Sequence, residues 1–238
     1  MIITCKFRDP TLASEDFPEM LRRMYCVTSS LAEKSEGLNH WFAQGNSLEE
    51  AHLYPAFEGG EPSTALLAVL NHKYRNDKSF TFISIWNGAA EQRDGVSLAL
   101  YVNDRGQPCT LTISNHKRRA NRFGGADAVK DIVAALVRLF QPLFVSVSPR
   151  YYAQKQVFDD KPGVGWMLYL PQVITAEQVP EAQALIPLPV GGKKQTGTII
   201  VSVADEVFSL DNPRHVELAN QIEIRLVDQD LLPRYADL

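Results

Sequence analysis

Asp159 and Asp160, followed directly by Lys161, are the side chains of this sequence that most resemble a reactive group. Paired carboxylates can hold Mg²⁺ and a nearby lysine can stabilise a developing negative charge, so the three residues could belong to a metal-dependent hydrolase. Adjacent residues of a strand point to opposite faces, however, and the next carboxylate along the chain is Glu177. The spacing therefore favours a solvated or partner-facing loop over a catalytic site.

Other residues with chemical potential lack the spacing of a known site. The five histidines show neither HxxxH nor HxH spacing, and no serine lies in a Gly-x-Ser-x-Gly motif. Gly163 and Gly165 resemble part of a phosphate-binding loop, but a strand-like run follows them instead of a helix. We therefore expect no catalytic residue, no metal ligand and no cofactor.

The charge of the chain argues against nucleic acid as a partner. Its formal net charge is −4 and its pI is near 5.8, whereas proteins bind nucleic acid mostly through an excess of Lys and Arg. One dense basic run, residues 116–122, contains no aromatic residue on which a base could stack. We interpret the run as a solvated loop or a contact to an acidic protein surface. For the chain as a whole, whose net charge is negative, the natural partner is a basic protein.

Composition indicates a globular protein of the reducing cytoplasm. The chain has 238 residues, of which 45% are hydrophobic and 22% charged, and this balance is typical of a soluble domain. Cys5, Cys26 and Cys109 are too scattered for a disulfide framework and are predicted to be small buried apolar residues. The N-terminal residues lack the apolar core of a secretory signal, and no apolar run of about 18 residues predicts a membrane span.

The two aspartates lie in the stretch around which the sequence is organised, residues 157–171. A Lys-Pro-Gly turn follows Asp160, and Gly163 and Gly165 then lead into the apolar run 166–170, predicted to be a buried strand that ends at Pro171. Trp166 is assigned to the core. The sequence thus predicts an acidic loop that is held against the core by its glycine-rich end.

Hydrophobic periodicity predicts the remaining elements. Apolar residues at three- and four-residue steps, or capping residues, predict helices over 15–31, 46–51, 63–74, 127–140, 175–182 and 212–227. Alternating or continuous apolar runs predict strands over 2–7, 40–44, 80–86, 96–102, 110–114, 143–148, 166–170, 185–190 and 198–203. Strands come in runs and not in strict alternation with helices, which favours an α+β fold with largely antiparallel sheets covered by helices. We expect a single domain over 1–238, and the alternative is two lobes at 1–142 and 143–238.

Several of these segments together resemble a known family. Residues 158–171, the run 194–203 and Asp211-Asn-Pro-Arg-His215 are similar to the immunity protein 52 family of bacterial polymorphic toxin systems, and residues 3–8 and 84–88 fit as well. The resemblance implies a non-enzymatic inhibitor that binds a co-encoded nuclease toxin with a restriction-endonuclease-like fold. Such a toxin would be an effector of a type VI or related secretion system, and the inhibitor would protect the producing cell and its sister cells.

The resemblance supplies no motif for the toxin contacts, so the interface candidates come from the residues themselves. Asp159, Asp160, Asp228 and Asp230 are acidic residues in segments predicted to be exposed, and they could meet the positive surface that a nuclease presents to DNA. Trp86 and Trp41 could anchor an interface as aromatic hot spots, with core packing as the alternative for both. Two other functions stay open: a metal-dependent hydrolase that uses Asp159 and Asp160, and a secretion adaptor that inhibits nothing. The sequence leaves the oligomeric state undetermined.

Overall fold

The structure, a computed structural model, describes residues 1–35, 37–45, 47–104, 106–115, 122–189 and 194–238. Two units make up the chain. Residues Lys6–Phe123 form the N-terminal unit, and Met1–Cys5 together with Gly124–Leu238 form the C-terminal unit. The first strand, β1 (Ile2–Phe7), therefore begins in the C-terminal unit and ends in the N-terminal unit.

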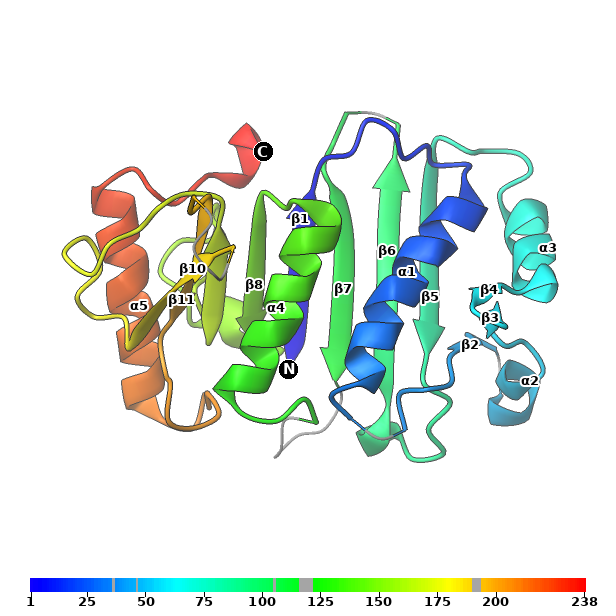
Figure 1. The fold of residues 1–238 in the computed structure, drawn as a ribbon, viewed down its shortest axis with the longest axis horizontal. Coiled ribbons are helices and arrows are strands. Elements are labelled where there is room, and N and C mark those ends of the chain that lie inside the picture. The colour runs from blue at the N-terminus through cyan, green and yellow to red at the C-terminus, as the bar shows by residue number, and fades with distance from the viewer. Residues whose placement is uncertain (36, 46, 105, 116–121, 190–193) are drawn as a thin grey trace. The chain divides into compact units, whose positions relative to one another are not determined.

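An antiparallel sheet with the strand order β7-β6-β5-β2 forms the centre of the N-terminal unit (Figure 1). Its strands are β2 (Phe42–Ala43), β5 (Phe80–Trp86), β6 (Val96–Asn103) and β7 (Cys109–Asn115). Burial alternates along β5, β6 and β7, so that Ile83, Leu98 and Leu111 belong to a face that is fully shielded from solvent. The period-two pattern of the sequence thus produces a sheet with one buried face.

Helices and a small hairpin complete the N-terminal unit. They are α1 (Phe17–Ala32), α2 (Leu48–His52), α3 (Thr64–Lys73), and the two-stranded sheet of β3 (Phe57–Glu58) and β4 (Glu61–Pro62). Each helix begins at a polar cap: the side chains of Asp16, Ser47 and Ser63 accept hydrogen bonds from backbone N–H groups of the first turn. The apolar face of α1 is buried and packs on β6.

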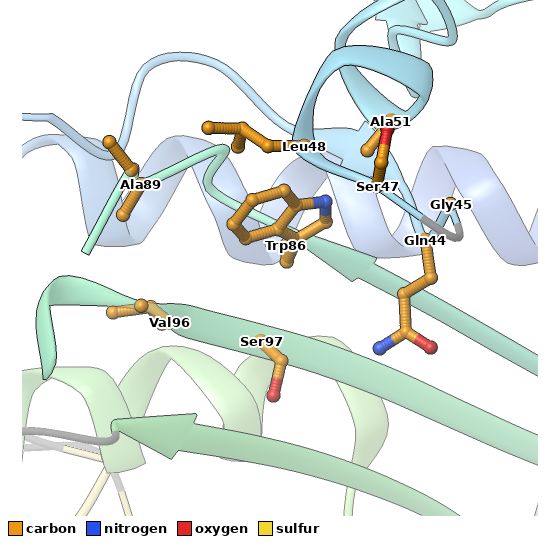
Figure 2. A pocket seen from close by; sticks show the side chains of 11 residues that line it. Gln44, Gly45, Ser47, Leu48, Ala51, Trp86, Ala89, Val96 and Ser97 are labelled. Carbon is orange, nitrogen blue, oxygen red and sulfur yellow. The ribbon is translucent and has the colours of Figure 1, made fainter. Parts of the chain in front are cut away.

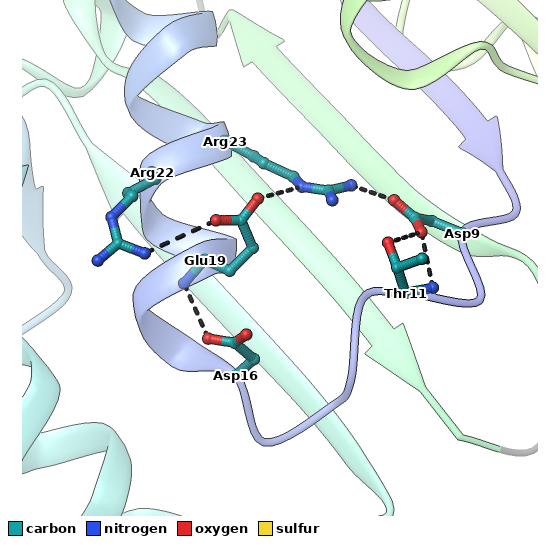
Figure 3. A network of polar contacts seen from close by, with 6 residues as sticks. All are labelled: Asp9, Thr11, Asp16, Glu19, Arg22 and Arg23. Carbon is teal, nitrogen blue, oxygen red and sulfur yellow. Dashed lines mark hydrogen bonds and ion pairs between the residues drawn. The ribbon is translucent and has the colours of Figure 1, made fainter.

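A polar network fastens α1 to the segment that follows β1 (Figure 3). The Arg23 guanidinium donates to the carboxylates of Asp9 and Glu19, and the Asp9 carboxylate also accepts hydrogen bonds from the backbone and the hydroxyl of Thr11. Although partial burial acts to raise the pKa of Asp9, the hydrogen bonds from Thr11 and Arg23 lower it to about 2.

The C-terminal unit contains a second run of antiparallel strands, in the order β10-β11-β9-β8. These are β8 (Phe144–Ser148), β9 (Met167–Leu170), β10 (Ala184–Leu188) and β11 (Gly197–Val201). All residues of β9 and β11 are buried, which agrees with their continuous apolar sequences. The edge strand β10 contains Pro187, whose missing N–H is tolerated at the rim of a sheet.

Two long helices belong to the C-terminal unit, α4 (Ala126–Phe140) and α5 (Pro213–Asp228). Helix α5 begins as the sequence predicts, because the Asn212 side chain accepts a hydrogen bond from the Arg214 backbone and Pro213 occupies the first turn. Near the end of the helix Ile222, Ile224 and Leu226 alternate as apolar residues of a strand do. The helix nevertheless continues unbroken, because Ile222 and Leu226 are buried four residues apart.

The predicted α+β class is confirmed, and most predicted elements form within a few residues of their expected bounds. One predicted helix is wrong: residues 175–182 form turns, because Pro180 disfavours the helical conformation of the residue before it. Cys26 is exposed on α1 and not buried as predicted, whereas Cys5 and Cys109 are buried. The basic run 116–122 lies almost entirely outside the described residues. A single domain, or lobes at 1–142 and 143–238, stays a prediction.

Candidate partner-binding site

The predicted acidic loop is present and solvent-exposed in the C-terminal unit. Asp159 and Asp160 are both exposed, and the Asp160 carboxylate lies 3.8 Å from the guanidinium Nε of Arg234. A pair this exposed contributes little stability, so the two carboxylates stay available to an external cation.

Two hydrogen bonds join this loop to the C-terminal segment. The Tyr235 backbone N–H donates to the Asp160 carbonyl at 2.8 Å, and the Lys161 ammonium donates to the Leu232 carbonyl at 3.0 Å. Residues about seventy positions apart in the sequence are thereby held side by side. Lys161 thus serves as a structural tie and not as a partner of the adjacent carboxylates.

The other two candidate aspartates precede the joined segment. Asp228 is the last residue of α5, and Asp230 adopts a left-handed conformation with φ of 53° where the chain leaves the helix. Both residues are exposed. The segment 231–235 that follows them is the one bonded to the loop, so all four predicted aspartates belong to one connected region of the C-terminal unit.

A buried carboxylate, Glu223 of α5, holds the loop from inside. Its oxygen atoms accept three hydrogen bonds: from the Tyr152 hydroxyl at 2.7 Å, from the Val157 N–H at 2.8 Å and from the Val164 N–H at 2.9 Å. Val157 and Val164 bracket the acidic loop, so a single side chain fixes both of its ends. Burial raises the pKa of Glu223 above its ordinary value, and the three hydrogen bonds act in the opposite direction.

The glycine-rich end of the loop is clamped to the core as the sequence predicts. Gly165 has φ of 52°, and a Cβ atom there would lie 2.8 Å from the Val147 carbonyl oxygen and 2.6 Å from the Cβ of Ser148. Trp166 follows with 1% exposure, and its indole N–H donates to the Val203 carbonyl at 2.8 Å. The assignment of Trp166 to the core is confirmed.

The two candidate aromatic anchors lie in the N-terminal unit and differ in accessibility. Trp41 is almost fully buried, and its indole N–H donates to the Leu38 carbonyl at 2.8 Å. Trp86 is half-buried and forms one wall of a pocket of about 670 Å³ (Figure 2). Its ring lies parallel to that of His52, and its N–H donates to the Ala43 carbonyl at 3.2 Å. A role of either tryptophan in partner binding stays a prediction.

Within the described ranges, no three His, Cys, Asp or Glu side chains gather in a geometry that could hold a metal ion. Asp159 and Asp160 point from an exposed loop, and the structure places no other acidic side chain with them in such a cluster. Of the helices that the structure describes, none combines the length and the apolar character that crossing a bilayer requires.

Comparisons with known proteins identify the family. The sequence profile of a family described as Immunity protein 52 matches residues 12–234. The chain belongs to the immunity protein 52 family. No curated protein matches the sequence. One solved structure, a Pseudomonas aeruginosa T6SS protein, aligns over 93% of this chain and 75% of its own length, with 11% identity and a TM-score of 0.48.

The family match covers most of the acidic region. The range matched by the family profile includes both ends of the loop and the bonded segment as far as Arg234, one residue before Tyr235. The C-terminal unit also carries the whole net charge of the chain: it has fourteen acidic and ten basic side chains, whereas the N-terminal unit has fourteen of each. The sequence gives no signal that Glu223 is buried. It stands between two isoleucines, and a glutamate on the surface of a helix can have the same neighbours.

Proposed function

We propose that this member of the immunity protein 52 family neutralises a co-encoded toxin by binding it. The toxin in this proposal is a nuclease effector with a restriction-endonuclease-like fold, delivered by a type VI or related secretion system. The chain acts in the cytoplasm without turnover and protects the producing cell and its sister cells. Family membership supports the immunity role, and the acidic surface supports a partner with positive charge.

The observation that carries the nuclease proposal is the connection between the acidic loop and the C-terminal segment. Four exposed aspartates, contributed by two segments far apart in the sequence, belong to one bonded region of a unit with excess negative charge. A nuclease must present positive potential to DNA. An acidic surface meets that potential with complementary charge, which raises the association rate and favours the correct partner.

Glu223 adds preorganisation to this surface. Because both ends of the loop are bonded to a buried side chain, the aspartates do not have to be ordered when the partner binds. Binding then costs less conformational entropy than a free loop would require.

The test combines a nuclease assay with a binding assay on the toxin encoded next to the gene. We expect co-elution and loss of DNA cleavage when this protein is added. The double variant Asp159→Lys plus Asp160→Lys should weaken binding by roughly tenfold to a hundredfold at low salt, since it places two like charges against the toxin. It should also make binding less sensitive to salt.

A matched control separates location from net charge. The double variant Glu33→Lys plus Glu58→Lys makes the same change in net charge at two exposed positions of the N-terminal unit and should leave affinity nearly unchanged. Unchanged DNA cleavage with no co-elution would remove the proposal. Equal losses in the two double variants would show that net charge and not this surface determines binding.

A further inference from the structure

One face of the sheet in the N-terminal unit lies open. In Figure 1, α1 crosses the β5–β7 sheet on one side, and it is the residues of that side that are buried. The alternate residues of the same strands point to the opposite side and are exposed or half-buried. Large side chains are among them: Phe80 is 40% exposed and Phe82 is 46% exposed.

The strand registers arrange this open face in three rows. Phe82 pairs with Tyr101, which pairs with Thr110; Ser84 pairs with Ala99, which pairs with Thr112; and Trp86 pairs with Ser97, which pairs with Ser114. The first row contains two aromatic side chains, those of Phe82 and Tyr101. The middle row consists of small side chains, and the third row contains the indole of Trp86. Four residues separate the outer rows along β5, about 13 Å.

A pocket opens at the third row. Trp86 and Ser97 both line it, together with Leu48 and Ala51 of α2 and Ala89 of the loop after β5 (Figure 2). Gln44, another lining residue, donates to the Ser84 hydroxyl at 3.0 Å and so connects the pocket with the middle row. The open face therefore has protruding aromatic rings at one end and a concave aromatic wall at the other.

We propose that this open face is a homodimer interface, and that its occupant is a second copy of this chain. A two-fold axis through the middle row places the Phe82 row of one copy on the Trp86 pocket of the other, and the reverse contact forms at the same time. An interface of this symmetry requires self-complementary ends of this kind. The small side chains of Ser84, Ala99 and Thr112 let the two sheets approach closely along the axis.

The charges of this face are compatible with a second copy as the occupant. The three rows contain no acidic and no basic side chain, and Lys6, beside Thr110, is bonded to the hydroxyl of that residue at 2.9 Å. The N-terminal unit is electrically balanced, so two copies that meet through it do not repel each other as two acidic surfaces would. Depletion of charge and enrichment of aromatic residues are the marks of an interface core.

The experiment measures the mass of the full chain by light scattering and by sedimentation over about two decades of concentration. We expect a concentration-dependent dimer. Phe82→Glu puts a charge on the aromatic row, and Ser97→Arg fills the pocket without disturbing the ring of Trp86. Each variant should weaken dimerisation roughly tenfold or more.

Mixing the two variants tests the geometry. In a mixed dimer the intact Phe82 of the Ser97→Arg copy enters the intact pocket of the Phe82→Glu copy. At the second contact, the new carboxylate faces the new guanidinium. The mixture should therefore recover dimer that neither variant forms alone. Thr112→Arg, on the axis, brings two like charges together when both copies carry it, and should weaken the dimer of that variant.

Circular dichroism establishes that each variant is folded, and Tyr151→Glu, at a tyrosine of the C-terminal unit that is 60% exposed, is the matched control that should leave the dimer intact. A chain that stays monomeric at every concentration overturns the proposal. So does a dimer that is indifferent to Phe82→Glu and Ser97→Arg. If the chain is monomeric and these variants instead lose capture of the toxin, the occupant is the toxin and the homodimer is excluded, whereas the proposed neutralisation stands.

Discussion

The hydroxyl of Tyr152 donates a hydrogen bond of 2.7 Å to the carboxylate of Glu223 inside the C-terminal unit. Both side chains are buried, and Glu223 in turn accepts the backbone N–H groups at the two ends of the acidic loop. Burial, and then the negative charge of Glu223, raise the pKa of Tyr152, so the hydroxyl stays protonated and remains a donor. The position of a surface loop thus depends on a pair of residues that solvent does not reach.

Replacing the buried carboxylate should be costly. Glu223→Ala leaves the Val157 N–H and the Val164 N–H without an acceptor and the Tyr152 hydroxyl with only the longer contact of 3.3 Å to the Asn220 side chain, and we expect a loss of about 3 to 5 kcal/mol in the free energy of unfolding. Urea denaturation measures this loss. Glu217→Ala, at an exposed position of the same helix, should change stability by less than about 0.5 kcal/mol. A similar small effect at both positions would show that Glu223 does not hold the loop.

Removing only the donor should give a pH-dependent effect. Tyr152→Phe takes away a hydrogen bond to the ionised form of Glu223, so the already raised pKa of Glu223 should rise further. Below the ordinary glutamate pKa of 4.5 the carboxyl is protonated in both the folded and the unfolded state, and this part of the stability difference between variant and wild type vanishes. The difference should grow as pH increases through the raised pKa, reaching about 1 to 2 kcal/mol. Urea midpoints measured across this pH range would contradict the assignment if the difference were constant.

Asp9 should contribute stability that is lost when the solution is acidified. Its pKa falls from an ordinary 3.8 to about 2, so the folded state favours the ionised form, and the contribution is present above the ordinary pKa. It should disappear as pH falls from about 4 toward 2. Asp9→Asn should therefore cost about 2 kcal/mol at neutral pH and little near pH 2. Thermal unfolding as a function of pH gives the comparison, with Asp211→Asn as an exposed control.

Two glycines with similar backbone angles should differ sharply on substitution. Gly165 and Gly59 have φ of 52° and 60°, but a Cβ atom at Gly165 meets the Val147 carbonyl, whereas a Cβ atom at Gly59 has no atom within 4 Å. Gly59→Ala should cost about 1 kcal/mol from backbone strain alone. Gly165→Ala should cost more than about 3 kcal/mol because the strand must also shift. Equal losses in unfolding measurements would mean that the clamp at Gly165 is not rigid.

Periodicity was sufficient to predict the helices whose apolar faces are long. Helix α4 forms over nearly the predicted residues because Val129, Ile132, Val133 and Leu136 recur on one face and become buried. Asn212 and Pro213 predict the start of helix α5. Its end is harder to predict, because Ile222 and Ile224 alternate with polar residues as they would in a strand. Exposure of Ile224 resolves the ambiguity, since the residue lies outside the helix face that packs.

The false helix at 175–182 shows where local signals fail. Thr175 and Gln178 form the reciprocal hydrogen bonds of a capping box, with the Thr175 N–H donating to the Gln178 side chain at 3.0 Å and the Gln178 N–H donating back at 3.3 Å. A helix start is therefore present without a helix. Pro180 follows too soon for a second turn to form, and the chain turns toward β10 instead.

The candidate site was predicted in part. The acidic loop, its glycine-rich end and the core position of Trp166 follow from residue types in sequence. The bonds that join the loop to the C-terminal segment do not, because they depend on Lys161 and Tyr235 meeting backbone carbonyls far away in the chain. Alternation likewise predicted the strands β5 and β6, but it could not tell which side of the sheet would be left uncovered.

The hydrogen bond between the Tyr235 backbone and Asp160 has a practical consequence for anyone who handles the protein. Tyr235 is three residues before Leu238. An affinity tag or a fluorescent domain joined after Leu238 would therefore lie beside the acidic loop and hinder access to it. Fusions at Met1 start instead from a strand, and the bonds that hold the loop do not involve that strand.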